Sequence, residues 1–135
     1  MKLSVTLVGD GIENPANALT MIHAAAMFGA ECRFRDTKGL TQSAGSSPGE
    51  TLKTITSTEI QALHSRIIAF DNLPGARDVY GFHAGRDFAV LMGNERRGLS
   101  HEFASFATDR VQVPMLSRRI NCLDVAAASA VALYY

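Results

Sequence analysis

A short polar stretch, GNERRG at positions 93–98, contains two adjacent arginines, a residue type suited to bind phosphate or carboxylate. It directly follows the apolar run 88–92, and a glycine stands at each of its ends. Arginines occur in pairs at three expected strand ends: Arg33/Arg35, Arg96/Arg97 and Arg118/Arg119. A guanidinium group binds phosphate or carboxylate through two parallel hydrogen bonds. These pairs therefore either hold phosphates or form ordinary solvated surface charge.

The surrounding pattern predicts the elements that position this stretch. Short apolar runs indicate strands, and apolar residues at helical spacing indicate helices. We expect strands at 3–8, 31–35, 66–70, 88–92 and 111–113, and helices at 17–28, 57–64, 100–107 and 122–135. Ser100 can cap its helix, and residues 37–54, rich in Gly, Ser, Thr and Pro, are expected to form a surface loop. Strands that alternate with helices predict an α/β fold, a mostly parallel sheet with helices on both faces.

Three loops of marked composition follow the expected strands: FDNLPG at 70–75, GNERRG at 93–98 and PMLSRRINC at 114–122. In parallel sheets, ligands bind at the carboxyl ends of the strands. Because all three loops leave such ends, we expect them to converge on one crevice.

The composition limits the class of protein. The 135 residues fit a single domain, 1–135, and 47% of them are hydrophobic, which allows a sizeable core. Acidic and basic residues balance at 13 each, so the net charge gives no support to broad nucleic-acid binding. No apolar stretch has the roughly 18 residues of a membrane span, and no signal-peptide pattern opens the chain. We therefore expect a cytoplasmic protein without a membrane partner.

The placement of cysteines and histidines argues against a metal site. Cys32 and Cys122 lie in different elements without metal-ligand neighbours at useful spacing, so we expect free, buried thiols. His64, His83 and His101 have no partners by spacing and are expected on the surface. The sequence therefore predicts neither a disulfide nor a metal centre.

Three segments in series resemble the SpoU (TrmH-type) RNA methyltransferases of the SPOUT superfamily. Residues 14–30, NPANALTMIHAAAMFGA, are similar to the first motif of that family, and 91–102, LMGNERRGLSHE, are close to its Gly-Asn-Glu-x-x-Gly-Leu motif. Residues 111–135 resemble its Pro-Met strand end, its short Ser-Leu-Asn-Val stretch and its Ala-rich last helix. The order and spacing of the motifs cover nearly the whole chain.

The resemblance implies a fold and a reaction that composition and periodicity do not reveal. It implies an α/β sheet whose C-terminal segment threads through a loop as a trefoil knot, a feature otherwise nearly absent from proteins. It also implies a homodimer with the catalytic pocket at the interface, and S-adenosyl-L-methionine held in a bent conformation by the knot. The usual reaction of the family moves a methyl group to a ribose 2′-hydroxyl of tRNA or rRNA. We expect no added RNA-binding domain.

The resemblance also assigns roles to residues. The backbone of the 93–98 loop would contact the cofactor, since Gly93 and Gly98 have no Cβ to block a close approach. Glu95 would anchor this loop or a neighbouring catalytic group. The residues expected to bind the cofactor are Ala69, Phe70, Asp71, Gly93, Asn94, Gly98, Val113, Met115, Cys122 and Leu123. Those expected to hold RNA phosphates are Arg96, Arg97, Arg118 and Arg119.

The chain departs from the family pattern at the residues that do chemistry. Asn17 stands at the Asn of the first motif, but His23 replaces its Arg, and Asp124 replaces the Asn of the third motif. Cys122 stands at the family's Ser, although one extra residue precedes it, so that Asn121 could take that place instead. A neutral imidazole could accept the ribose proton at neutral pH.

Simpler roles stay open for these residues, and three functions follow. Asn17 could merely cap its helix, His23 could be a packed core residue, and Asp124 could be a helix N-terminal acid. The first function is an S-adenosylmethionine-dependent RNA methyltransferase with Asn17, His23 and Glu95 as catalytic residues. The second is a knotted cofactor-binding or dimeric module that has lost or changed its catalysis. The third is a small Rossmann-like nucleotide-binding domain, although no G-x-G-x-x-G follows the first strand.

Overall fold

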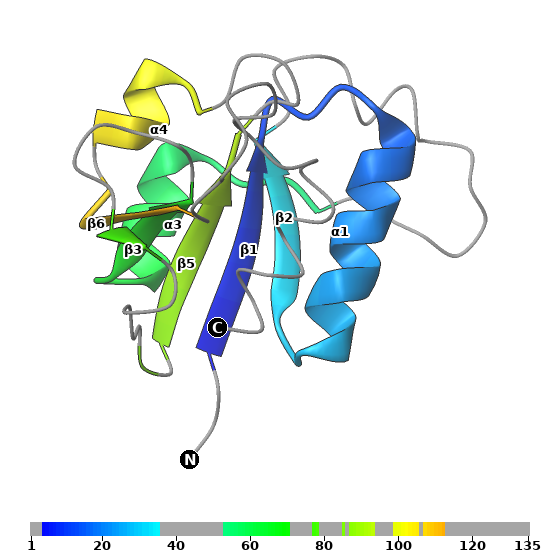
Figure 1. Ribbon diagram of the computed structural model, residues 1–135, viewed down its shortest axis with the longest axis horizontal. Coiled ribbons are helices and arrows are strands. Elements are labelled where there is room, and N and C mark those ends of the chain that lie inside the picture. The colour runs from blue at the N-terminus through cyan, green and yellow to red at the C-terminus, as the bar shows by residue number, and fades with distance from the viewer. Residues whose placement is uncertain are drawn as a thin grey trace.

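The computed structural model describes residues 4–35, 53–70, 77–78, 85, 87–93, 99–105 and 107–112 of the 135-residue chain. Within these ranges one sheet contains β1 (Ser4–Asp10), β2 (Glu31–Arg35), β3 (Ile67–Phe70), β4 (Arg77–Asp78), β5 (Asp87–Met92) and β6 (Asp109–Gln112). The helices are α1 (Pro15–Met27), α3 (Ser57–Leu63) and α4 (His101–Ser105), as Figure 1 shows. The strands pair in parallel, in the order β2-β1-β5-β3-β6-β4. The predicted α/β fold with a mostly parallel sheet is confirmed.

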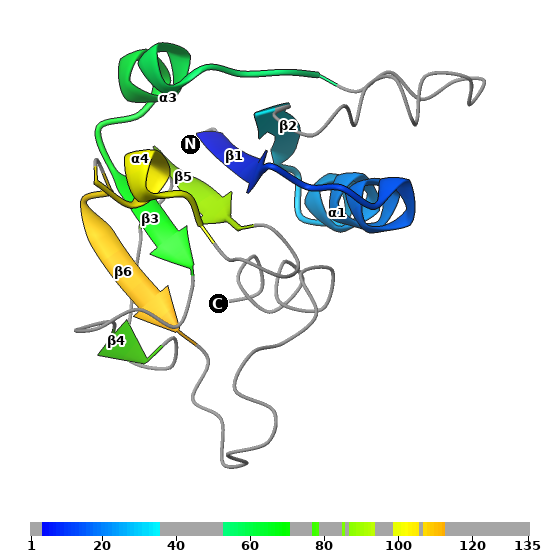
Figure 2. The ribbon, with the colours of Figure 1, turned by 90° about the horizontal axis from the view of Figure 1, so that it is seen from above.

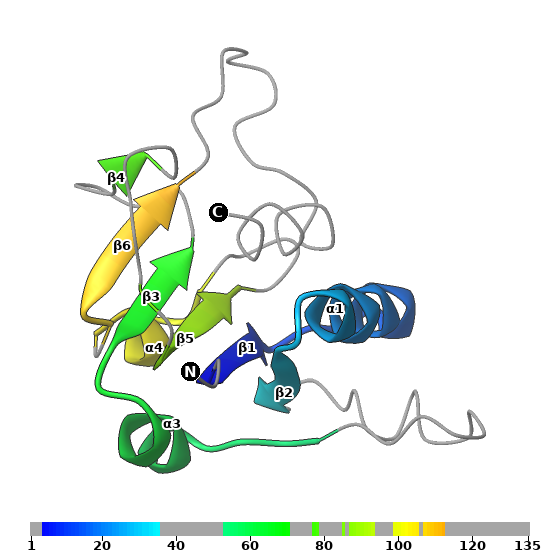
Figure 3. The same ribbon diagram turned by 90° about the horizontal axis from the view of Figure 1, so that it is seen from below.

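Helices cover both faces of the sheet, as predicted (Figure 2, Figure 3). α1 packs on one face, where its Met21 joins Leu7 of β1 in one apolar cluster. α3 and α4 pack on the other face, where Ile60 and Phe103 join Val8 in a second cluster. Leu7 and Val8 are neighbours in β1, and a strand sends successive side chains to opposite faces. Burial on two sides therefore explains why this strand is apolar without alternation.

The path of the chain explains why the helices divide between the faces. β1 connects through α1 to its neighbour β2, whereas β2 connects through α3 to β3, which lies beyond β1 and β5. The two connections run in opposite directions along the sheet. Because parallel crossovers are right-handed, they place their helices on opposite faces.

Helix α1 begins two residues earlier than the pattern predicts, at Pro15. Asn14 caps it, since its side chain accepts the backbone N–H of Ala16 at 2.9 Å and Pro15 occupies the first turn. Asn17 lies inside the helix, so the alternative that Asn17 is the cap is wrong. The chain leaves α1 through Gly29, whose φ of 73° is a value that glycine adopts without strain.

Helix α3 starts with a capping box. Thr56 Oγ1 accepts the backbone N–H of Glu59 at 3.3 Å, and the Glu59 carboxylate accepts the backbone N–H of Thr56 at 3.2 Å. The hydrogen bond from the Thr56 hydroxyl lowers the pKa of Glu59, and the nearby Arg33 guanidinium lowers it further. The box fixes the start of α3 at Ser57, the residue that the sequence predicts.

The expectation for His64 is wrong, because this side chain is buried. Its Nε2 lies 2.9 Å from Thr6 Oγ1 in β1, and its Nδ1 lies 2.6 Å from the Asp87 carboxylate at the start of β5. An ionised carboxylate only accepts, so Nδ1 donates to Asp87; in the neutral imidazole Nε2 then accepts the Thr6 hydroxyl. These bonds tie the end of α3 to two central strands. His101 is exposed as predicted, and His83 lies outside the described residues.

The remaining boundaries differ from the predictions by a few residues. β6 begins two residues before the predicted strand 111–113, and α4 is shorter than the predicted helix 100–107. β4 was not predicted, because a strand of two residues has no periodic pattern. The predicted helix 122–135, the trefoil knot and most of 37–54 lie outside the described residues. None of the helices in the described ranges has the length and hydropathy needed to cross a membrane.

Candidate functional site

The carboxyl ends of five adjacent strands lie in one row across the sheet. Gly9 of β1 pairs in register with Phe34 of β2 and with Met92 of β5. Phe70 of β3 continues the row, because it pairs with Met92 on one side and with Val111 of β6 on the other. The three predicted ligand loops therefore follow neighbouring strands, β5, β3 and β6, at the same edge of the sheet.

This edge is apolar and closely packed. Phe70 and Met92 are buried, and so is Gly93, which directly follows β5. A Cβ at Gly9 would lie 2.8 Å from Ile12 Cγ1 and 2.8 Å from a ring carbon of Phe34, so only glycine fits there. A ligand at this row of strand ends would therefore meet apolar side chains and backbone groups.

The structure describes three of the residues expected to bind the cofactor. Ala69 and Phe70 end β3, Gly93 follows β5, and all three are buried at the carboxyl edge. Ala69 pairs with Leu91, so the two strand ends are adjacent. The other expected site residues lie outside the described residues: Asp71, Asn94, Glu95, Arg96, Arg97, Gly98, Val113, Met115, Arg118, Arg119, Asn121, Cys122, Leu123 and Asp124. The roles assigned to all these residues stay predictions.

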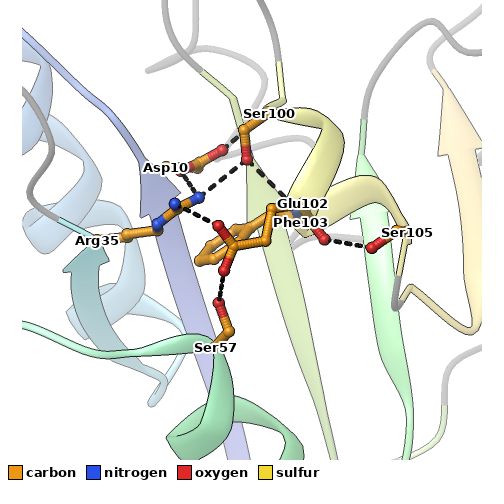
Figure 4. A network of polar contacts seen from close by, with 7 residues as sticks. All are labelled: Asp10, Arg35, Ser57, Ser100, Glu102, Phe103 and Ser105. Carbon is orange, nitrogen blue, oxygen red and sulfur yellow. Dashed lines mark hydrogen bonds and ion pairs between the residues drawn. The ribbon is translucent and has the colours of Figure 1, made fainter.

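A buried carboxylate, that of Asp10, stands at the end of β1 beside this row (Figure 4). Its Oδ2 accepts the backbone N–H of Ser100 at 2.8 Å, and its Oδ1 accepts Arg35 Nη1 at 3.3 Å. Arg35 Nη1 also donates to Ser100 Oγ at 3.0 Å. Three side chains thus join the carboxyl ends of β1 and β2 to the start of α4.

Arg35 extends this network towards both helices on the α3 face. Its Nη2 donates to one carboxylate oxygen of Glu102 at 2.6 Å, and the other oxygen accepts the Ser57 hydroxyl at 2.6 Å. The guanidinium carbon lies 4.7 Å from the centroid of the Phe103 ring, within the range of a cation–π contact. In Figure 4 these side chains form one connected set around Arg35. Contacts within the chain therefore hold the Arg35 guanidinium group.

Arg33, the other member of this arginine pair, is engaged as well. Its guanidinium donates to the Thr54 carbonyl at 3.0 and 2.7 Å and to the Glu59 carboxylate at 3.2 Å. These bonds hold α3 and the segment before it against β2. For the pair Arg33/Arg35, contacts within the chain replace both expected roles, phosphate binding and simple solvation.

Asn17 and His23, the two expected catalytic residues on α1, lie on different parts of this helix. Asn17 is half-buried in the first turn, whereas His23 is exposed, so the alternative that His23 is a core residue is wrong. Six residues of α-helix separate two side chains by about 9 Å along the axis and about 120° around it. The structure therefore does not bring the two together within one chain.

Cys32, in β2, is a free thiol in a half-buried position. Burial raises its pKa to about 12, and the neighbouring Glu31 carboxylate adds to this shift. Such a thiol stays protonated at neutral pH and is a poor nucleophile. In the part of the chain that the structure describes, no group of three or more His, Cys, Asp or Glu side chains could hold a metal ion.

One comparison decides the family, because it spans almost the whole chain. The SpoU rRNA Methylase family matches residues 4–134. The chain belongs to the SpoU rRNA methylase family. This membership agrees with the order of the three motifs and rules out the Rossmann-like hypothesis. No curated protein sequence matches the chain.

Solved structures share the fold of this SpoU-family chain. A chain from a study of the 2-OH methylation of C/U34 on tRNA is 26% identical with a TM-score of 0.77, and the match covers 98% of this chain and 93% of that one. The methyltransferase AviRb from Streptomyces viridochromogenes in complex with AdoMet is 22% identical with a TM-score of 0.78, covering 99% and 57%. An AdoMet-bound rRNA methyltransferase from Sinorhizobium meliloti is 22% identical with a TM-score of 0.79, covering 99% and 56%. The chain thus spans nearly all of the first protein and slightly over half of the other two.

The sequence pattern did not reveal that Asp10, Arg35 and Ser100 of this SpoU-family chain form one connected set. Arg35 lies 25 residues from Asp10, and Ser100 lies 90 residues from it, so spacing along the chain carried no signal. One signal was present, namely a carboxylate at the end of an apolar strand, since a buried charge needs a partner. The capping role predicted for Ser100 is confirmed, because its Oγ accepts the backbone N–H of Phe103 at 3.2 Å.

Proposed function

We propose that this SpoU-family protein is an S-adenosylmethionine-dependent RNA methyltransferase that acts as a homodimer in the cytoplasm. Its reaction transfers a methyl group to a ribose 2′-hydroxyl of tRNA or rRNA. The observation that carries the proposal is the family match over residues 4–134. The relative studied for 2-OH methylation of C/U34 on tRNA supports the choice of the ribose hydroxyl.

The carboxyl edge of the sheet fits S-adenosylmethionine. Phe70 and Met92 end their strands as buried apolar side chains, Gly93 follows Met92, and small-molecule sites are mostly apolar with few polar contacts. The charges nearby, on Asp10 and Arg35, are paired with each other. The cofactor supplies a methyl group on a positively charged sulfur. Two of the similar structures were solved with AdoMet, which supports this assignment.

Helix α1 supports the homodimer. Its sequence, PANALTMIHAAAM, contains no Asp, Glu, Lys or Arg. The residues Leu19 and Met27 are 39% and 81% exposed. An exposed helical face without charge is suited to pack against another protein surface. We assign this face to the dimer interface.

The dimer also gives His23 a place in the reaction. α1 starts near the carboxyl edge, and eight residues of helix carry His23 about 12 Å along the axis from Pro15, away from the cofactor edge of its own chain. In the proposed dimer, His23 of one chain faces the cofactor edge of the other. The imidazole accepts the ribose proton, a step that typically contributes about 10²–10⁴-fold to the rate. Asn17 orients the hydroxyl, and Glu95 holds the cofactor loop or a neighbouring catalytic group.

A second function, a cofactor-binding or dimeric module without catalysis, has one observation in its favour. His23 and Asp124 stand where the family has Arg and Asn, and imidazole makes no bidentate phosphate contact. The two functions share the cofactor and the dimer but differ in turnover. Methyl transfer to RNA therefore separates them.

Calorimetric titration with S-adenosylmethionine and S-adenosylhomocysteine tests the cofactor assignment. We expect binding by the wild-type protein and none by Gly93→Val, since a Cβ and two methyl groups would block the approach of the cofactor to the backbone. Ala62→Val, an exposed substitution on α3, is the matched control and should bind as the wild type does. The absence of heat and of a thermal shift at millimolar ligand would contradict the proposed function.

A further inference from the structure

The carboxylate of Asp10 bonds the backbone at Ser100, seven positions after Gly93, the residue that follows β5. Asp10 is the last residue of β1, and its side chain is only 3% exposed. Its Oδ2 accepts the backbone N–H of Ser100 at 2.8 Å, which is the point where the chain enters α4. Figure 4 shows this bond next to the Arg35 guanidinium. The N–H of Ser100 is therefore fixed to the end of β1.

The same strand holds the near end of that segment. Gly9 of β1 pairs with Met92 of β5, and Gly93 is the next residue along the chain. Gly93 is buried and precedes Ser100 by seven positions. The end of β1 thus fixes both the point where the chain leaves the sheet and the point where it returns.

Arg35 fixes the orientation of the Asp10 carboxylate. It donates to the Asp10 oxygen that Ser100 does not use, at 3.3 Å, and to Ser100 Oγ at 3.0 Å. Each oxygen of Asp10 therefore has its own donor. A buried ion pair often stabilises a fold no better than well-packed apolar side chains would. The main consequence of this pair is geometric, because it sets the position of Ser100 relative to Gly93.

We propose that Asp10 is a positioning residue for S-adenosylmethionine, which it does not touch. Its carboxylate fixes Ser100 relative to Gly93, the buried residue after β5 at which we place the cofactor contact. This inference rests on the proposed function. It adds that cofactor affinity depends on an ion pair between the ends of β1 and β2.

The test compares Asp10→Asn with a matched carboxylate at the opposite edge of the sheet. Asp109, at the start of β6, accepts Arg66 Nε at 3.2 Å and is also largely buried, with 23% of its side chain exposed. We expect Asp10→Asn to raise the dissociation constant and the KM for S-adenosylmethionine by about tenfold or more, because the arrangement that binds the cofactor would then be populated about a tenth of the time or less, and the apparent affinity falls by that fraction. We expect kcat and the KM for RNA to stay within about twofold of wild type, and Asp109→Asn to leave all four values unchanged.

Two results would overturn this role. The first is wild-type cofactor affinity in folded Asp10→Asn, and the second is an equal loss of affinity in Asp109→Asn, which would indicate a general loss of stability. If the wild-type protein itself fails to bind the cofactor, the proposed function falls and the role of Asp10 falls with it. Binding by the wild type with unchanged binding by Asp10→Asn removes the role of Asp10 alone.

Amide hydrogen exchange of the wild-type protein keeps the proposal testable if Asp10→Asn does not fold. Saturating S-adenosylmethionine should slow exchange at the Ser100 N–H more than at the His64 N–H, which bonds the Ile60 carbonyl at 3.1 Å. Equal slowing at both amides would show that the cofactor does not act on the Asp10 bond, and the proposal would be wrong.

Discussion

Nδ1 of the His64 imidazole lies 2.6 Å from the Asp87 carboxylate, and Nε2 of the same ring lies 2.9 Å from the Thr6 hydroxyl. Removing the imidazole leaves a buried cavity and a buried hydroxyl without its hydrogen-bond partner. We expect His64→Ala to lower the free energy of unfolding by about 2 kcal/mol or more. Urea denaturation followed by circular dichroism measures this loss. His101→Ala, at an exposed position, should change stability by less than about 0.5 kcal/mol, and an equal effect of both variants would contradict the role given to His64.

If the uncharged face of α1 forms the dimer interface, a charge placed on this face should dissociate the dimer. Leu19→Glu places a charge on this face, and burying a carboxylate without a partner is costly. We expect a dimer for the wild-type protein and a mass near 14.5 kDa, that of one chain, for the variant by light scattering at micromolar concentration. Leu63→Glu is the matched control, because Leu63 is 51% exposed but lies on α3. Dissociation by Leu63→Glu alone would place the interface on the opposite face of the sheet.

His23 should matter for turnover and little for cofactor binding. We expect His23→Ala to lower kcat by about 10²-fold or more, the usual contribution of a general base, with unchanged affinity for S-adenosylmethionine. His23→Arg restores the residue type of the family motif and should keep or raise activity. Steady-state methyl transfer to RNA and calorimetry give the two readouts. Full activity of His23→Ala on a methylated RNA would show that another group takes the proton.

Mixed dimers then test whether His23 acts on the other chain. Gly93→Val and His23→Ala should each be nearly inactive alone. If each site combines the cofactor edge of one chain with His23 of the other, mixing and reassembling the two variants should restore about a quarter of the wild-type activity, since half of the dimers carry one intact site. No recovery, with mixed dimers shown to form, would place His23 in the site of its own chain.

The raised pKa of Cys32 predicts an unreactive thiol. In Cys122→Ser, which leaves Cys32 as the single thiol, disulfide exchange with a coloured reagent at pH 8 should be slower by roughly 100-fold or more in the folded state than in urea. Because the pKa of Cys32 is higher in the folded than in the unfolded protein, this thiol contributes to the free energy of unfolding. The contribution is fully present below the unfolded pKa of 9.0 and is lost as the pH rises towards about 12. Cys32→Ser should remove this part of the decline. Equal thiol reactivity of folded and unfolded protein would contradict the burial of Cys32.

Local patterns predicted most of the fold, since burial on two faces leaves a signal in the sequence itself. The strand at Glu31–Arg35 was predicted with both ends correct, and β3 and β5 to within one residue. The predicted start of α1, at Asn17, is two residues too late, because it follows the apolar spacing and not the capping signal. The pair Asn14–Pro15, a capping residue before a first-turn proline, was the stronger signal.

The long-range polar contacts of the fold and of the candidate site were not predictable in the same way. His64 pairs with Thr6 across 58 positions, and Asp10 bonds Ser100 across 90. Such partners meet only after the sheet has set its strand order, and neither motif spacing nor periodicity carries that information. The family resemblance supplied the cofactor and the reaction, but it did not indicate that Arg35 serves the fold.

Methyl transfer tests the central claim most directly. The protein is incubated with S-adenosylmethionine labelled in its methyl group and with bulk RNA of its own organism, and the RNA is digested to nucleosides for mass spectrometry. The proposed function predicts label in a 2′-O-methyl nucleoside, none with Gly93→Val, and about 10²-fold less with His23→Ala. Cofactor binding without transfer of label to any RNA would contradict it and would leave a binding module, and label on a base would contradict the ribose hydroxyl as the target.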